Sequence, residues 1–127
     1  MAAAMMAGAP AAQADAGSGC IIGSSCLVLF YNSYQGGSST SFRGSNVADF
    51  AGYKFLSSGA GQGQAVKNNA ASATNDSAYA ATIFYNSNYG GACDKIADYS
   101  YTTQLHNTYN ENASFKWNSS RTDCYVF

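Results

Sequence analysis

Few residues in this chain of 127 could carry covalent or metal chemistry. They are four cysteines, one histidine and seven carboxylates. A Ser-His-Asp or Cys-His catalytic arrangement would have to use His106, and the neighbours of His106 form no known motif. The carboxylates are scattered, and nothing indicates the opposed pair that a glycosidase needs. The sequence therefore predicts a binding protein without catalytic residues, not an enzyme.

The four cysteines are typical of a small secreted domain that two disulfides cross-link. They are Cys20, Cys26, Cys93 and Cys124, and three pairings are possible. Gly23 permits a turn between the first two, which favours the pairs Cys20–Cys26 and Cys93–Cys124. Loop-closure entropy would give these bridges about 2 and about 4 kcal/mol. The alternative is a zinc site that uses all four sulfur atoms, because one histidine is available and no Cys-x-x-Cys occurs.

The overall composition excludes several classes of protein. Charged residues make up 10% of the chain and the net charge is −1, so no basic surface is available for nucleic acid. No apolar run approaches the ~20 residues that span a membrane. Ser, Asn and Gly are abundant beside 10 Tyr and 7 Phe, and this mixture is typical of short strands joined by tight turns. We expect one all-β domain and a monomer.

The first 16 residues are rich in Ala and Met and indicate a secretory signal peptide. Two small-x-small cleavage patterns occupy residues 12–14 and 14–16. No Lys or Arg precedes the apolar stretch, which a translation start upstream of Met1 would explain. A disordered or helical Ala-rich arm is the alternative. We expect a secreted, extracellular protein with one domain over residues 17–127.

An internal duplication is the strongest pattern in the sequence. The matching segments, in the same order in both halves, are residues 30–37 with 84–91, 47–50 with 96–99, and 68–72 with 110–114. Strand-like apolar runs precede the first pair, and each member of that pair ends in Gly-Gly, which can fold a hairpin. The pattern predicts two similar halves, at about 20–74 and 78–127, that face each other.

The duplicated hairpins resemble the Greek-key motif of the βγ-crystallins. That motif is an aromatic, four spacers, an aromatic, one spacer and a glycine, and Phe84, Tyr89 and Gly91 match each position. The first half allows two registers, each with one non-aromatic residue in an aromatic place. They are Leu29, Tyr34 and Gly36, or Phe30, Gln35 and Gly37. The resemblance implies that these residues hold the fold.

The Cys-x5-Cys pattern ahead of the first strand, on a two-repeat chain, resembles the bacterial peptidase inhibitor family I36. That family includes the Streptomyces metalloproteinase inhibitor. The resemblance covers residues 20–127 and implies a βγ-crystallin-like sandwich of two four-stranded Greek-key motifs. It also implies a secreted inhibitor of an extracellular protease, most readily a metalloprotease.

An inhibitor of this kind needs a loop that contacts the protease. The candidates are residues 21–25, held between two cysteines, and residues 57–64, which their glycines predict to be flexible. In the metalloproteinase inhibitor the bond presented to the enzyme lies in a second short disulfide loop. Cys93 has no cysteine a few residues away, so no reactive-site residue is transferred to this chain.

The Asn- and Ser-rich segments resemble the calcium motif of the βγ-crystallins. The candidate ligands are Asn68, Asn69 and Ser72 in the first half and Asn110, Glu111 and Ser114 in the second. Glu111 brings the single negative charge, so we expect weak binding, with a dissociation constant of about 10⁻⁴ to 10⁻³ M. The alternative is that these side chains satisfy turn backbone as Asx-turns. No cofactor is expected to be required.

Two other functions stay open at this point. The fold implied by the resemblance is also similar to Streptomyces killer-toxin-like proteins, which favours a secreted toxin or surface-binding module. A structural calcium-binding βγ-crystallin is the second alternative. A protease panel, a growth-inhibition assay and a melting curve with calcium would separate the three.

Overall fold

The computed structural model describes Cys20 and residues 25–127. These residues form strands and turns, which confirms the predicted all-β class, and among them no helix could cross a membrane. The predicted signal peptide lies outside the described residues. The strands are β1 (Cys26–Asn32), β2 (Gly36–Arg43), β3 (Ser72–Asp76), β4 (Ala81–Asn86), β5 (Gly90–Ile96), β6 (Tyr101–Thr102), β7 (Ser114–Trp117) and β8 (Tyr125–Val126).

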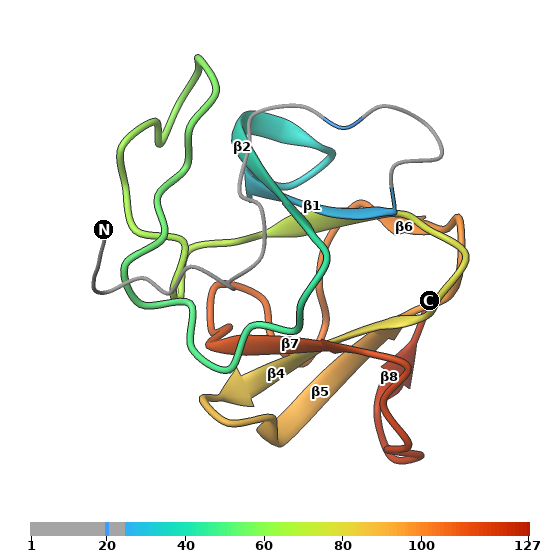
Figure 1. The fold of residues 1–127 in the computed structure, drawn as a ribbon. Coiled ribbons are helices and arrows are strands. Elements are labelled where there is room, and N and C mark those ends of the chain that lie inside the picture. Colours follow the sequence, from blue (N-terminus) through green and yellow to red (C-terminus); the bar gives the residue numbers. More distant parts are fainter. Residues whose placement is uncertain (1–19, 21–24) are drawn as a thin grey trace.

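Two four-stranded sheets pack face to face as a sandwich (Figure 1). One sheet has the order β2-β1-β3-β6 and the other the order β7-β4-β5-β8. Each half of the chain also pairs with the sheet of the other half. β6 comes from the second half and pairs with β3 of the first, while Val47 of the first half bridges Phe115 in β7. The halves are therefore interlocked through both sheets.

The core lies between the sheets and is rich in aromatic rings. Leu29 of β1 and Ile83 of β4 are fully buried there. Phe42 and Phe50 of the first half meet Phe115 of the second, with ring centroids 5.8 and 6.1 Å from that of Phe115. Aromatic side chains bury large apolar areas at a low cost in rotamer entropy, which suits a domain of this size.

The Greek-key hairpins β1–β2 and β4–β5 have the same register in both halves. In each, an asparagine pairs across the turn with the first glycine. The second glycine has a left-handed φ, of +72° at Gly37 and +81° at Gly91. The first-half motif is therefore Phe30, Gln35 and Gly37. The register that ends at Gly36 is wrong, because the positive φ falls one residue later.

Gln35 occupies the place that Tyr89 takes in the second half. Tyr89 packs against Phe84 with ring centroids 5.9 Å apart. Gln35 instead donates from its side-chain amide to carbonyl oxygens in β3 and β6, at 3.2 and 2.7 Å. Tyr34, which belongs to the rejected register, is 77% exposed. Side-chain hydrogen bonds therefore hold the first hairpin at the position where an aromatic contact holds the second.

The disulfide pairing is the predicted one. Cys20 is bonded to Cys26 at the start of β1, and Cys93 of β5 is bonded to Cys124 just ahead of β8. All four sulfur atoms are oxidised, so none is available as the thiolate that a zinc site needs.

Candidate functional site

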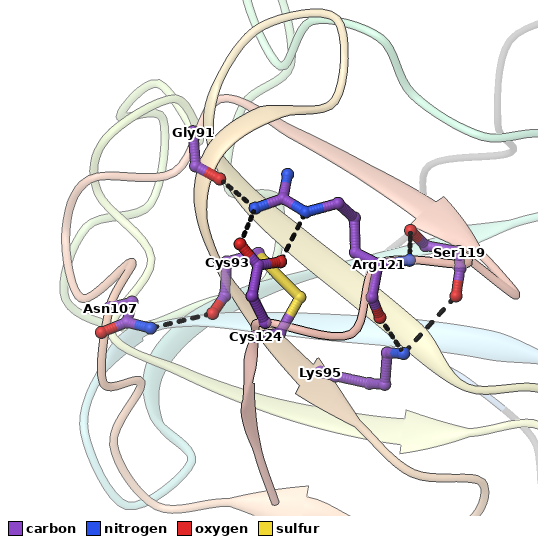
Figure 2. Close-up of polar contacts among 8 residues, drawn as sticks. Gly91, Cys93, Lys95, Asn107, Ser119, Arg121 and Cys124 are labelled. Atoms are coloured by element: carbon purple, nitrogen blue, oxygen red, sulfur yellow. Dashed lines mark hydrogen bonds and ion pairs between the residues drawn. A yellow bond between two sulfur atoms is a disulfide. The ribbon is translucent and has the colours of Figure 1, made fainter.

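One disulfide and two basic side chains hold the C-terminal segment against β5 (Figure 2). Cys93 is buried in β5 and bonded to Cys124. Arg121 donates to the carbonyl oxygen of Gly91 at 3.0 Å, and Lys95 donates to the carbonyl oxygen of Arg121 at 2.7 Å. The segment is fixed before it enters β8, which gives this disulfide a structural role.

Cys93, Asp123 and Cys124 are the one group of clustered metal-ligating residue types among the described residues. Their sulfur atoms form the disulfide and offer no thiolate. The Asp123 carboxylate accepts two hydrogen bonds from Arg121, at 2.7 and 3.1 Å, and these lower the pKa of Asp123. The group is an ion pair beside a disulfide and not a metal centre.

Asp94 is fully buried and organises the loop that carries the single histidine. Its carboxylate accepts from the N–H groups of His106, Asn107 and Thr108 at 2.8 to 3.2 Å, and from the Thr108 hydroxyl at 2.6 Å. The His106 ring is hydrogen-bonded to Asn107 and stacks on Tyr125, with centroids 4.0 Å apart. In the described part of the chain no nucleophile is paired with this ring, so the geometry offers no catalytic triad.

The two Asn- and Ser-rich segments, residues 68–72 and 110–114, are hydrogen-bonded to each other. The N–H of Asn68 donates to the carbonyl oxygen of Asn112 at 2.8 Å, and the N–H of Asn110 donates to that of Ala70 at 3.0 Å. Asn68 and Asn110 have φ values of +64° and +53°, in a region that asparagine enters more readily than most residues. These two asparagines shape the turns in which they lie.

Ser72 and Ser114 make matching contacts in the two halves. Each hydroxyl donates to the carbonyl oxygen at the end of a hairpin's first strand, at 2.6 and 2.7 Å. Each also accepts from an N–H of the adjoining turn, at 3.1 Å in both halves. The serines therefore tie the two segments to the Greek-key hairpins.

A polar pocket of about 260 Å³ opens beside these segments. Of the six predicted calcium ligands, Asn69 and Asn110 line it and the other four do not. Glu111 instead accepts from the Tyr85 hydroxyl at 2.7 Å, which raises the pKa of Tyr85. The pocket offers neutral oxygens and no carboxylate, so a divalent cation would bind there only weakly. It is lined by Tyr31, Asn32, Ser33, Asn69, Ala71, Tyr109 and Asn110.

Residues 54–65 form a loop, called the braced loop below, that projects from the sandwich near β2 and is drawn in green in Figure 1. Its base is a short antiparallel pairing, with a bridge between Lys54 and Ala65. The N–H of Phe55 donates to the carbonyl oxygen of Gln64 at 3.0 Å, and the N–H of Gly63 donates to that of Phe55 at 2.8 Å. The second candidate contact loop thus has an internal scaffold.

Hydrogen bonds to β2 brace the loop along one side. The N–H groups of Leu56 and Ser57 donate to the carbonyl oxygen of Ser39 at 3.1 and 3.2 Å. The N–H of Ser38 donates to the carbonyl oxygen of Ala60 at 2.8 Å. The backbone is tied to β2 at several points, in contrast to the flexible loop that the glycine content predicts. Sequence reasoning missed these contacts because their partners lie 17 or more positions away.

Tyr31 of β1 braces the loop from below, at Gly61. A Cβ atom at Gly61 would overlap the Tyr31 ring, and Gly61 has a φ of +85°. Tyr31 in turn meets Phe55 edge to face, with ring centroids 5.6 Å apart. Both the backbone angle and the close approach therefore require glycine at this position.

The other candidate contact loop, residues 21–25, lies outside the described residues except for Ser25. The disulfide that closes it is described, and it holds the Cα atoms of Cys20 and Cys26 6.2 Å apart. The two cysteines that flank this loop are therefore held together.

The family model of peptidase inhibitor family I36 matches residues 13–96. The chain belongs to this family. The matched part of this I36 chain contains the first disulfide, the first Greek-key hairpin and the whole braced loop. No curated protein matches the chain.

Solved structures similar to this I36 chain include βγ-crystallin domains. A chain from work on the evolution of the eye lens βγ-crystallin domain fold has a TM-score of 0.66 at 16% identity, covering 85% of this chain and 99% of that one. The N-terminal domain of protein S has a TM-score of 0.58 at 15% identity, with coverage of 76% and 99%. A βγ-crystallin domain from Flavobacterium johnsoniae has a TM-score of 0.54 at 15% identity, with coverage of 76% and 97%. The likeness confirms the predicted sandwich, and at these identities it concerns the fold alone.

Proposed function

We propose that this I36 chain is a secreted inhibitor of an extracellular metalloprotease. The observation that carries the proposal is the family match over residues 13–96. Secretion is supported by the two disulfides, because such bonds persist in oxidising compartments outside the cytosol. A monomer that binds its target protease is the simplest form of this activity.

The geometry supports binding rather than catalysis. The interlocked sheets, the two disulfides and the braced loop form a preorganised scaffold. A preorganised surface loses less conformational entropy on association, which favours tight binding. The buried Asp94 is fully used in holding its loop, and the His106 ring has a stacked partner instead of a nucleophile.

A panel of secreted proteases tests the proposal. The oxidised, folded chain is titrated at micromolar concentration against thermolysin-like, subtilisin-like and trypsin-like enzymes. We expect loss of activity in the thermolysin-like class. Failure to inhibit any class, with folding verified by a melting curve, would contradict the proposal and favour the toxin-like alternative, which a growth-inhibition assay then examines.

Calcium binding is a second, weaker proposal that rests on the polar pocket. Its amide and hydroxyl oxygens are ligand types that calcium accepts, but no carboxylate lines it. With a dissociation constant of about 10⁻⁴ to 10⁻³ M, calcium at about 1 mM would add about 0.4 to 1.4 kcal/mol of stability. Melting curves with calcium and with a chelator measure this difference. Identical curves at millimolar calcium would contradict even weak binding.

A further inference from the structure

Leu56 is an exposed aliphatic side chain on the braced loop, with 45% of its surface accessible. The stretch from Phe55 to Val66 contains no charged residue, and after Leu56 it is dominated by Ser, Gly, Ala and Gln. Most other large exposed apolar side chains of the described residues are tyrosines. Leu56 is therefore an exposed apolar side chain on a loop of mostly small residues, whose one charged residue, Lys54, lies at its base.

The backbone around Leu56 is already hydrogen-bonded within the protein. The Leu56 N–H donates to the Ser39 carbonyl oxygen and to the Thr40 hydroxyl, both at 3.1 Å. The Leu56 carbonyl oxygen accepts from the Gln62 side-chain amide at 3.2 Å. The Ser57 N–H also donates to the Ser39 carbonyl oxygen. The two N–H groups cannot donate to another chain without breaking their contacts to β2, and the Leu56 carbonyl oxygen already has a partner in Gln62.

A peptide that binds as an added strand does so through free backbone N–H and C=O groups. A protease that aligned the bond between Leu56 and Ser57 as a substrate would need such groups on both sides of the bond. Here the backbone groups around this bond are hydrogen-bonded to β2 and to Gln62. The side chain of Leu56 is therefore accessible to a partner, whereas its backbone is not free to pair as a substrate strand does. The loop is therefore suited to fill a specificity pocket with a side chain and not to bind as a substrate strand.

We propose that the braced loop is the surface that enters the protease cleft, with Leu56 filling an apolar specificity pocket and the loop remaining uncut. This inference rests on the inhibitor function proposed above and names the element that performs it. The family match covers the whole loop, which supports its part in that function. An aliphatic anchor fits enzymes with apolar pockets, and it does not fit a trypsin-like pocket with an aspartate at its base.

The experiment compares Leu56→Asp with Val126→Asp in inhibition assays on the enzyme that the parent chain inhibits. Val126 is a matched control, because it is an aliphatic side chain that is 63% exposed on β8, outside the braced loop. Burying a carboxylate in an apolar pocket should raise the inhibition constant about 30-fold or more, as expected for a central anchor. The Val126 variant should change it less than about threefold, as most surface substitutions do.

Equal inhibition by the parent and Leu56→Asp would overturn the inference while leaving the inhibitor function intact. A parent chain that inhibits no enzyme would overturn both. Mass spectrometry of the chain after incubation with excess enzyme tests the second part. An intact chain supports binding without cleavage, and fragments that end at Leu56 would contradict it.

Discussion

Gly61→Ala tests how the braced loop is held in place. The new Cβ would overlap the Tyr31 ring, so the ring or the loop backbone has to move. An L-residue in the left-handed region costs about 1–2 kcal/mol. Displacing Tyr31 from its edge-to-face contact with Phe55 adds about 1 kcal/mol. We expect a total loss of about 2–3 kcal/mol, which lowers the melting temperature by about 10–20 °C in a domain of this size.

Gly63→Ala is the matched control for this prediction. Gly63 lies in the same loop and has a φ of +86°, against +85° at Gly61, but a Cβ there would meet no atom within 4 Å. Its cost should be limited to backbone strain, about 1–2 kcal/mol. The assay is thermal unfolding of both variants beside limited proteolysis of the loop. Equal melting temperatures for the two variants would refute the reasoning, since the Tyr31 contact is what separates them.

Three other variants or treatments probe the rest of the fold. Gly91→Val puts a β-branched residue at a φ of +81°, with its Cβ 2.7 Å from the side-chain amide nitrogen of Asn86, so it should lower the free energy of unfolding by more than about 3 kcal/mol. A melting curve like that of the parent would show that the hairpin is misassigned. Reduction should lower the melting temperature sharply and raise the mass by four hydrogens, whereas an unchanged mass would contradict the two disulfides. Asp94→Asn leaves one acceptor oxygen for four donor groups, so it should lower the free energy of unfolding by about 2–4 kcal/mol and speed amide hydrogen exchange at residues 106–108. Unaltered exchange at these residues would argue against the anchoring role of Asp94.

The fold class follows from features that local sequence contains. Turn-forming Gly-Gly pairs after apolar runs predicted both Greek-key hairpins, and the cysteine spacing favoured the correct disulfides. The first-half register stayed open, because glutamine in an aromatic place gives no hydrophobic signal. Gln35 closes its hairpin through hydrogen bonds to β3 and β6, which only the assembled sheet provides.

Contacts between distant segments were not predictable. The pairing of β6 with β3 and the bridge between Val47 and Phe115 depend on how the halves pack. A repeat in the sequence does not specify these contacts. The glycines of the braced loop suggested flexibility, because composition does not reveal that Tyr31 packs on Gly61. In the sequence Asp94 is one of several scattered carboxylates, because the residues that donate to it lie 12 to 14 positions away.

Titration of a thermolysin-like metalloprotease with the oxidised chain tests the inhibitor function most directly. The enzyme is held at a concentration well above the expected inhibition constant, and its residual activity is followed as the chain is added. We expect activity to fall linearly and to end near one equivalent of chain, with the chain recovered intact. Full enzyme activity in the presence of excess folded chain would contradict the proposed function.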